Sequence, residues 1–431
     1  MKVLIVGSGG REHAIAYSVA KSSKVDKIYC APGNAGIGQI AECVDITAME
    51  FGKLAAFAKE KEIDLTIIGM DDPLVGGIVD VFEEQGLRVF GPRKNAAIIE
   101  GSKAFSKDLM KKYGIPTAAY ETFTDPQKAL EYLETAKMPI VLKADGLALG
   151  KGVLICNTLE EAKTGVKTLM LDKQFGDAGN EIVIEEFMTG REVSVLCYCD
   201  GTHIKPMTSA QDHKRAKDGD QGLNTGGMGT VAPNPYYTPA IAAECMEKIF
   251  LPTIKAMNVE GCPFKGCLYF GLMLTPDGPK VIEYNCRFGD PETQVVLPLL
   301  ESDLLKVMTA CTEGTLADTE VKFSDGAAAC VILASGGYPV AYEKGKPITG
   351  LVDGQLPDEP NVTVYHSGTA ITEDGQLVTN GGRVLGVTAT APGLPRAISI
   401  AYEAAEHIHF DKLHKRTDIG MRALKALAEK E

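Results

Sequence analysis

The sequence predicts an α/β protein that opens with a parallel sheet and closes with a smaller domain of short strands. In the N-terminal region, short apolar runs at 3–6, 27–31, 65–69 and 88–91 alternate with amphipathic stretches such as 12–21 and 52–61. This alternation is typical of parallel strands covered by helices. After residue 322 the chain becomes rich in glycine and short strands. Its length of 431 residues exceeds what one core usually holds, so about three domains are expected.

The elements after the first sheet are predicted from periodicity and turn residues. A helix is expected at 102–113, followed by strands at 140–143, 153–156, 181–187 and 192–199. Strands at 267–274 and 280–285 are joined by a Pro-Asp-Gly turn, which is typical of a hairpin. The last region is expected to hold strands at 328–333, 362–369 and 384–389 and to close with one helix at 394–408.

Composition and charge exclude several classes of protein. The apolar content of 45% is ordinary for a globular chain, and the net charge of −13 argues against a non-specific nucleic-acid binder. No run is long enough to span a membrane, and the N-terminus lacks the apolar stretch of a signal peptide. The eleven cysteines are scattered, with no Cys-x-x-Cys pair. We therefore expect reduced thiols and a cytoplasmic protein with no nucleic-acid or membrane partner.

Loops that follow the first strands are candidate ligand sites, because ligands bind beyond the carboxyl ends of parallel strands. These loops are 7–10, 32–36 and 70–73. The first resembles a dinucleotide fingerprint only weakly, since Glu12 replaces its third glycine and the second strand ends without an acidic residue. Two alternatives stay open: a glycine turn that receives a phosphate at a helix start, or a tight turn alone.

A second glycine-rich loop, 143–152, joins two strands and therefore cannot be a Walker loop, which enters a helix. Lys143 precedes it and Lys151 lies within it, so it could fold over a triphosphate; the alternative is a long hairpin with solvated lysines. The strand that ends at Glu185 and Phe187 suits an adenine ring, and Glu192 could take ribose hydroxyls. These carboxylates could equally be solvated.

The segment 281–294 carries the metal prediction. Glu283 and Asn285 lie on one face of a strand, because strand side chains alternate with a period of two. Carboxylate and amide oxygens together with phosphates suit Mg²⁺. Arg287, on the same side, offers a planar fork for a carboxylate or phosphate. The alternative is a surface turn in which Arg287 pairs with Asp290.

Four stretches resemble one known family. They are the opening VGSGGREHA, the run 211–215, the loop 224–229 and Arg287-Phe288-Gly289-Asp290-Pro291-Glu292-Thr293-Gln294. In this order they resemble the glycinamide ribonucleotide synthetases, ATP-grasp ligases of purine synthesis, and the resemblance covers essentially the whole chain. It implies an N-terminal substrate-binding domain (1–102), a two-lobed ATP-grasp domain (103–322, with a lid subdomain at about 118–190) and a small β-rich α+β C-terminal domain (323–431).

The resemblance also implies the reaction. ATP would drive the ligation of glycine to 5-phosphoribosylamine through glycyl phosphate, with Mg²⁺ or Mn²⁺, in a monomer or weak dimer. Residues implied for ATP are Lys103, Lys143, Gly150, Lys151, Gly152, Glu185, Phe187 and Glu192, and those for metal are Glu283 and Asn285. The strand 267–274 supplies no carboxylate, which leaves the number of metal ions open.

Roles for the remaining residues follow from their chemistry within that reaction. Arg287 would hold the glycine carboxylate or the transferring phosphoryl group, while Asp212 orients the amine or touches the metal. Lys214 and Arg215 would neutralise phosphates, and the loop containing Gly226 and Gly227 would offer backbone amides to an oxyanion. The residues expected at the ribose phosphate and substrate are Gly9, Gly10, Arg11, Glu12, Asn34 and Asp290. His13 and His213 could move protons or be structural.

Three rival functions are separable. A biotin-carboxylase-like enzyme typically continues its metal strand with Gln-Val-Glu-His, where this chain has Phe288-Gly289-Asp290-Pro291. A nicotinamide-dependent oxidoreductase is disfavoured by the broken glycine fingerprint. A nucleotide sensor would bind ATP without producing ADP.

Overall fold

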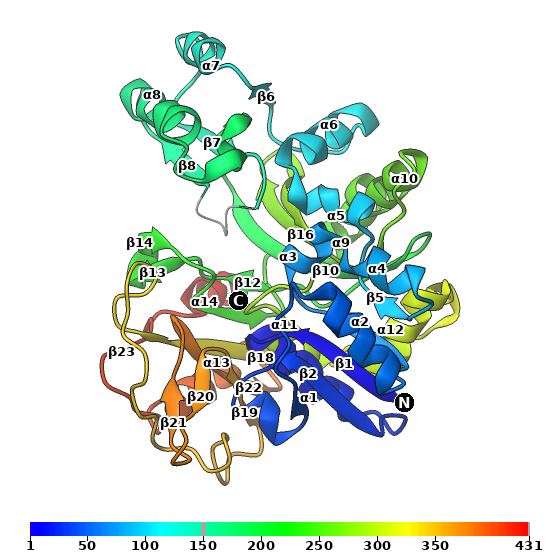
Figure 1. The fold of residues 1–431 in the computed structure, drawn as a ribbon. Coiled ribbons are helices and arrows are strands. Elements are labelled where there is room, and N and C mark those ends of the chain that lie inside the picture. Colours follow the sequence, from blue (N-terminus) through cyan, green and yellow to red (C-terminus); the bar gives the residue numbers. More distant parts are fainter. Residues whose placement is uncertain (148–151, 430–431) are drawn as a thin grey trace.

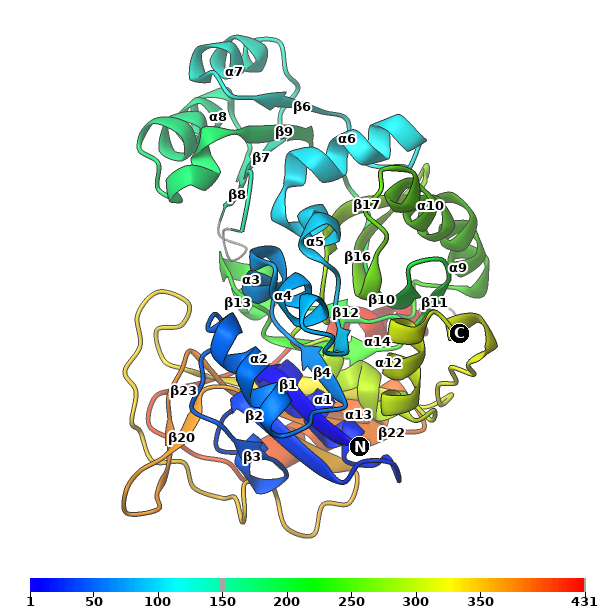
Figure 2. The same cartoon turned by 45° about the vertical axis from the view of Figure 1, so that its right-hand side comes forward.

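Figure 1 shows the arrangement of the chain in a computed structural model that describes residues 1–147 and 152–429. The N-terminal sheet (blue) and the C-terminal sheet (yellow to red) lie side by side. A small lobe (cyan and green) projects from the rest of the molecule. The turned view in Figure 2 shows the same separation. Within the described ranges, no helix is both long and apolar enough to cross a membrane.

The N-terminal sheet is parallel throughout, as predicted. Its order is β3-β2-β1-β4-β5. The strands are β1 (Lys2–Gly7), β2 (Lys27–Pro32), β3 (Glu42–Cys43), β4 (Leu65–Ile68) and β5 (Val89–Phe90), and the helices are α1 (Gly10–Val19), α2 (Phe51–Glu60), α3 (Asp71–Gly76), α4 (Ile78–Glu84) and α5 (Lys94–Gly101). β2 pairs with one side of β1 and β4 with the other, so the order in which strands are added reverses at β1. The loop after β1 therefore lies at the switch point of the sheet, where ligands commonly bind.

The projecting lobe is an antiparallel sheet in the order β6-β9-β7-β8. Its elements are β6 (Tyr120–Phe123), α7 (Pro126–Leu133), β7 (Ile140–Ala144), β8 (Val153–Cys156), α8 (Leu159–Val166) and β9 (Ile182–Glu186). It has its own hydrophobic cluster, which includes Leu142, Ile184 and Val166.

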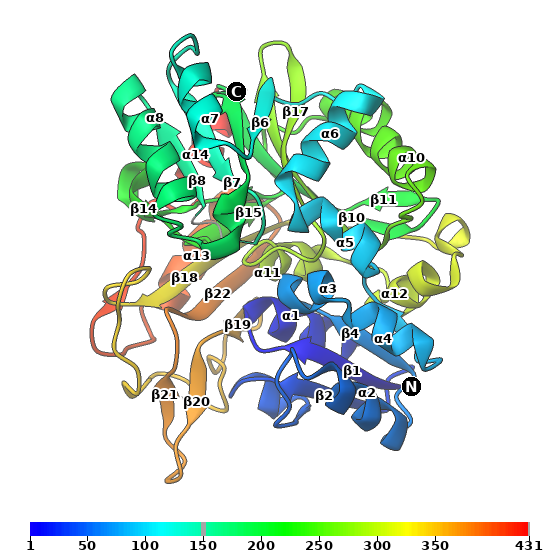
Figure 3. The ribbon, with the colours of Figure 1, turned by 45° about the horizontal axis from the view of Figure 1, so that its top comes forward.

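The central sheet has the order β11-β10-β16-β17. It consists of β10 (Arg191–Asp200), β11 (Ile204–Pro206), β16 (Lys265–Thr275) and β17 (Gly278–Asn285), with α6 (Lys103–Tyr113), α9 (Pro239–Cys245) and α10 (Leu251–Val259) around it. The expected hairpin of β16 and β17 is present. Figure 3 shows α6 and α10 on the side of this sheet away from the C-terminal strands.

The C-terminal sheet includes two strands from the middle of the chain. Its order is β12-β15-β18-β22-β19, and β23 also pairs with β18. These strands are β12 (Gln211–Asp212), β15 (Gly229–Ala232), β18 (Ala327–Ser335), β19 (Val362–His366), β22 (Arg383–Ala391) and β23 (Leu413–His414). Two hairpins, β13 (Arg215–Lys217) with β14 (Gln221–Asn224) and β20 (Thr369–Ile371) with β21 (Leu377–Thr379), lie outside the sheet.

The helices of this half include one that was not expected. The predicted helix at 394–408 forms as α13 (Leu394–Ala405), but the chain does not close with it, because α14 (Met421–Ala428) follows. The short α11 (Thr293–Val296) contacts both α1 and β18 and so lies between the N-terminal and C-terminal sheets, and α12 (Leu304–Glu313) packs on β10. All eleven cysteines are free, as predicted.

Candidate active site

The end of β17 presents Glu283 and Asn285 on one face of the central sheet. Tyr284, between them, points the other way into the core and packs against Phe270, with 5.4 Å between ring centroids. Gly271 on β16 pairs with Glu283, and a Cβ at Gly271 would stand 3.1 Å from the Glu283 side chain. The neighbouring strand therefore leaves room for a carboxylate that is 35% exposed.

Positive charges surround this carboxylate. Lys214 Nζ lies 3.9 Å from Glu283 Oε1. Burial alone would raise the pKa of the Glu283 carboxyl, but the charges of Lys214, Lys143, Lys103 and Arg287 hold it below its ordinary value. An ionised carboxylate beside several cations suits a site that holds a divalent metal ion together with the phosphates of a nucleotide.

The protein does not provide a complete metal cage. No group of three or more His, Cys, Asp and Glu side chains with metal-binding geometry occurs within residues 1–147 and 152–429. Glu283 and Asn285 can thus hold an ion only together with oxygens from ligand or water. Such incomplete sites are typical of Mg²⁺, which keeps several water or phosphate ligands.

Lys103 is the first residue of α6 and joins this helix to the loop after β7. Its Nζ donates to the carbonyl of Gly146 at 2.8 Å, while the Asp145 carboxylate accepts from the Ala104 amide at 2.9 Å. Ser102 caps the helix by accepting from the Phe105 amide. The predicted ATP residues Gly150 and Lys151 lie outside the described residues. Gly152 lies at the far side of the loop, where its carbonyl accepts from Ala144.

Glu185 is buried between two lysines. Its carboxylate oxygens lie 3.0 Å from Lys143 Nζ and 3.2 Å from Lys107 Nζ, and at most 6% of each side chain is exposed. Lys107 also donates to Thr117 at 2.7 Å, and Lys143 to the Ile282 carbonyl at 3.3 Å. Burial lowers the pKa of Lys107 to about 8. The side chain of Glu185 therefore sets the position of Lys143 rather than facing a ring.

Sequence reasoning missed Lys107. Nothing in its pattern distinguishes it from the exposed lysines that follow it on the same helix, and only the fold brings it to Glu185. Phe187, 39% exposed, lies beyond β9. Glu192, half exposed, lies 3.6 Å from Lys214, so its carboxylate has a lysine partner.

Arg287 pairs with a residue that the sequence did not single out. Its Nη2 lies 3.1 Å from Oε1 of Glu100, a buried carboxylate on α5. The alternative in which Arg287 pairs with Asp290 is therefore wrong, because Asp290 instead lies 3.5 Å from Arg383 and accepts from Gln294 at 2.7 Å. Arg287 Nε is buried and has no hydrogen-bond partner in the described part of the chain, which leaves one donor for a ligand.

The loop after β1 meets the end of β17 from the other side. Arg11 Nη1 donates to the Phe288 carbonyl at 3.1 Å, and its Nε donates to Glu12 at 2.8 Å. Glu12 also accepts from the Gly9 amide at 2.8 Å, which forms a capping box at the start of α1. A Cβ atom at Gly10 would stand 2.6 Å from the side chain of Gln294. The close packing of α11 against this loop therefore leaves no room for a side chain at position 10. The Glu12 carboxylate is thus committed to helix capping and to Arg11.

Two residues next to this loop, Asn34 and Asp71, have surroundings that the sequence did not predict. Asn34 donates to the carbonyls of Ser8 and His366 and accepts from two amides, so its side chain ties the N-terminal loops to the C-terminal domain. Asp71, at the start of α3, was not predicted as a site residue. Burial would raise the pKa of Asp71, but the charges of Arg287 and Arg11 lower it.

The run 212–215 lies at the edge of the C-terminal sheet. Burial and the charge of Glu292 raise the pKa of Asp212 well above its ordinary value. Lys214 points instead to Glu192 and Glu283, and the charge of Glu192 raises its pKa. Arg215 Nη1 donates to the Gly222 carbonyl at 2.9 Å, within its own hairpin.

The glycine loop after β14 does not offer the donors that were expected. The amide of Gly226 donates to Tyr338, that of Gly227 to Thr225, and that of Met228 to the His213 carbonyl. These three amides already have acceptors, so the expectation that the loop offers free amides to an oxyanion is wrong for them. Gly227 is needed for another reason, since its φ is +121° and a Cβ would stand 2.7 Å from Asp212.

Both candidate histidines are buried and structural in their contacts. His13 Nδ1 accepts from the His366 amide at 2.7 Å, and burial lowers its pKa to about 3. His213 Nε2 accepts from the Gly420 amide at 3.1 Å, and burial lowers its pKa to about 4. Neutral rings with fixed partners do not suit proton transfer near neutral pH.

Comparison with known proteins decides the family. Models of phosphoribosylglycinamide synthetase match residues 1–100 (N domain), 101–293 (ATP-grasp (A) domain) and 328–422 (C domain). The chain belongs to this family. Its function is that of a glycinamide ribonucleotide synthetase, an ATP-dependent ligase of purine biosynthesis.

Relatives of the same family match over nearly the full length. The phosphoribosylamine–glycine ligase of Caldanaerobacter subterraneus is 48% identical over 97% of this chain and 99% of its own. That of Vibrio parahaemolyticus is 48% identical over the whole of both chains. The crystal structure of the Thermotoga maritima enzyme superposes with a TM-score of 0.85 at 36% identity, covering 97% of this chain and all of that one.

A biotin carboxylase domain shares only the fold. The domain from the Hydrogenobacter thermophilus 2-oxoglutarate carboxylase gives a TM-score of 0.74 at 16% identity, over 96% of this chain and 91% of that one. The ATP-grasp fold predicted from the sequence is thereby confirmed, and the different sequence after β17 agrees with membership of the synthetase family.

Proposed function

We propose that this site joins glycine to 5-phosphoribosylamine through glycyl phosphate. One observation carries the proposal: the charges of Lys214, Lys143, Lys103 and Arg287 hold the pKa of the Glu283 carboxyl below its ordinary value. A carboxylate kept ionised beside these cations suits a site for a divalent ion and the phosphates of a nucleotide triphosphate. The names of the relatives, which are phosphoribosylamine–glycine ligases, support the choice of the two other substrates.

The reaction balances in two steps. A carboxylate oxygen of glycine attacks the γ-phosphorus of ATP; the bond to the β-phosphate oxygen breaks, ADP leaves and glycyl phosphate forms. The amine of phosphoribosylamine then attacks the acyl carbon, and the carbon–oxygen bond to phosphate breaks, which gives glycinamide ribonucleotide and phosphate. The amine loses one proton in this second step. Catalysis of this kind rests on positioning and on neutralising charge.

The residues of the first step would act on phosphates. Lys103, which donates to the Gly146 carbonyl, and Lys143, which pairs with Glu185 on the neighbouring strand, would neutralise the triphosphate. Arg287, with its unpartnered Nε, would hold the glycine carboxylate as it attacks. A divalent ion, Mg²⁺ or Mn²⁺, would be held by Glu283 and Asn285 and would supply charge neutralisation at the transferred phosphoryl group.

The residues of the second step would act on the amine and the ribose phosphate. Asp212 would orient the amine, and its raised pKa suits a group that accepts the proton that the amine loses. Lys214 would stay charged beside the acyl phosphate. Arg11, with the loop amides of Gly9 and Gly10 at the start of α1, would anchor the ribose phosphate. Gly150 to Gly152, Phe187 and Glu192 would enclose ATP, and Arg215, Gly226, Gly227, Asn34 and Asp290 would shape the substrate side.

We further propose the division 1–102, 103–322 and 323–431, a cytoplasmic location, and a monomer or weak dimer. The test of function measures ADP release against a panel of amino acids, with and without phosphoribosylamine. Strict dependence on glycine and that amine is expected. ADP release with another amino acid, or none with glycine and the amine together, would refute the proposed substrates.

A further inference from the structure

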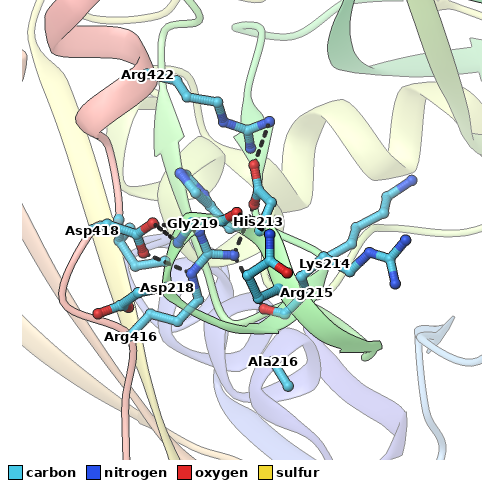
Figure 4. Close-up of polar contacts among 12 residues, drawn as sticks. His213, Lys214, Arg215, Ala216, Asp218, Gly219, Arg416, Asp418 and Arg422 are labelled. Atoms are coloured by element: carbon cyan, nitrogen blue, oxygen red, sulfur yellow. Dashed lines mark hydrogen bonds and ion pairs between the residues drawn. The ribbon is translucent and has the colours of Figure 1, made fainter.

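The C-terminal segment 414–422 holds the run 212–220 along almost its whole length. Figure 4 shows the two segments facing each other. His414 Nε2 lies 2.7 Å from the Ala216 carbonyl, and the Gly420 amide donates to His213 at 3.1 Å. The Thr417 amide donates to Asp218 at 2.8 Å, and Asp418 accepts from the Gly219 amide at 2.9 Å.

Arg416 is the centre of this contact. Only 1% of its side chain is exposed. Its Nε and Nη2 donate to the two oxygens of Asp418 at 2.7 and 2.8 Å, and its Nη1 donates to the Arg215 carbonyl at 3.1 Å and to Asp220 at 3.0 Å. The planar guanidinium therefore links both sides of the contact, which a lysine could not reproduce.

Arg422 makes the contact nearest to the reacting groups. It lies in the first turn of α14, and its Nη2 donates to the Asp212 carbonyl at 3.0 Å. Its Nη1 lies 3.5 Å from Asp220, which also pairs with Arg416. The side chain of Arg422, which is 39% exposed, thus contacts the backbone of Asp212 rather than its carboxylate.

Lys214 is the third residue of the run 212–220, yet its side chain turns away from segment 414–422 (Figure 4). It reaches Glu192 and Glu283 across the site, and its carbonyl accepts from the amide and the hydroxyl of Thr225. The neighbours of Lys214 are held by segment 414–422: the His213 ring accepts from the Gly420 amide, and the Arg215 carbonyl accepts from Arg416. The backbone of Lys214 is therefore fixed, while its ammonium group remains in the site and available to a ligand.

We infer that Arg422 and Arg416 are positioning residues for the transfer step, which they serve by fixing the backbone that carries Asp212 and Lys214. The inference rests on the roles proposed above for those two residues. Within residues 1–147 and 152–429, neither arginine makes a hydrogen bond or ion pair with a residue proposed to bind ATP. Loss of Arg422 should therefore slow turnover while leaving ATP binding largely intact.

The test compares Arg422→Gln with Arg422→Lys in the full-length protein. Arg422 is chosen because it is partly exposed, whereas replacement of the buried Arg416 would also disturb folding. Arg422→Gln is expected to lower kcat by about tenfold or more, as for loss of a charge-assisted hydrogen bond, while KM for ATP changes less than about threefold. Arg422→Lys should recover much of the loss, since an ammonium can donate to the Asp212 carbonyl and pair with Asp220.

The matched control is Arg396→Gln, an exposed arginine of the same domain whose contact to Glu403 is 3.8 Å long. It should behave as the unaltered protein. An unchanged kcat in Arg422→Gln overturns the inference. So does a loss that Arg422→Lys does not relieve, or a parallel fall of kcat, ATP affinity and Tm, which marks a purely structural role. If the unaltered protein itself releases no ADP with glycine and phosphoribosylamine, the proposed function fails instead.

Discussion

Replacement of Glu185 by glutamine tests the buried arrangement beneath the proposed triphosphate site. The carboxylate lies 3.0 Å from Lys143 and 3.2 Å from Lys107, and all three side chains are buried. Glutamine keeps the size of the side chain but removes its charge, which leaves two buried ammonium groups without their common partner. Breaking a buried ion pair by removing one partner costs about 3–5 kcal/mol, and we expect the lower end because the amide oxygen still accepts one hydrogen bond.

The loss should appear in two measurements. Urea-induced unfolding should show a free energy of unfolding lower by about 3 kcal/mol. Steady-state ADP release should show a raised KM for ATP, because Lys143 loses the carboxylate that fixes its position. The matched control is Glu186→Gln, an exposed residue next along β9. A stability loss below about 1 kcal/mol together with an unchanged KM would refute the reasoning, since exposed ion pairs contribute no more than that.

Three further predictions concern the metal, the anion and the pH dependence. Glu283→Ala should abolish metal-dependent ADP release and leave the circular dichroism spectrum unchanged, whereas Glu121→Ala on β6, an exposed position, should change neither the activity nor the spectrum. Full activity of Glu283→Ala at ordinary Mg²⁺ would remove the metal assignment. Arg287→Lys should lower kcat/KM by about ten- to one-hundredfold because it loses the planar fork, and near-normal kinetics would mean that Arg287 is structural. Burial lowers the pKa values of His13 and His213 to about 3 and 4. Below about pH 6.5 these two residues therefore bind more protons in the unfolded chain than in the folded protein, and the free energy of unfolding should fall as the pH falls toward those values. Thermal unfolding from pH 7 to pH 5 should show this decline, with a shallower slope in His13→Gln; equal slopes would contradict it.

The strands were largely predictable because their signals are local. Residues 3–6 of β1 are apolar and buried, and β4 is buried along its whole length with Thr66 as its one polar residue, as expected for parallel strands covered on both faces. The hairpin of β16 and β17 follows from its turn residues, and the common face of Glu283 and Asn285 from the period of a strand. The final helix α14 was missed although its pattern is amphipathic: Ala423 and Ala426 are buried, and Leu424 and Leu427 pack against the same core.

The partners of the site residues were not predictable in the same way. Glu100 and Arg287 are far apart in sequence, and nothing local shows that α5 brings one beneath the other. The family pattern identified Arg287 but not its partner. Likewise the glycines at 226 and 227 suggested free amides, whereas the fold places Tyr338 and Thr225 against those amides. Long-range packing decides which polar groups are already satisfied.

The shared sheet of the C-terminal half has a consequence for how the chain can be cut. β15 pairs with β12 on one side and with β18 on the other, although the proposed domain boundary lies between β15 and β18. A fragment that stops at that boundary would carry β15 with a bare edge of amides and carbonyls, a ready template for aggregation. A nascent chain meets the same situation until β18 has been synthesised. The ligase core and its C-terminal domain should therefore fold as one cooperative unit rather than as separable modules.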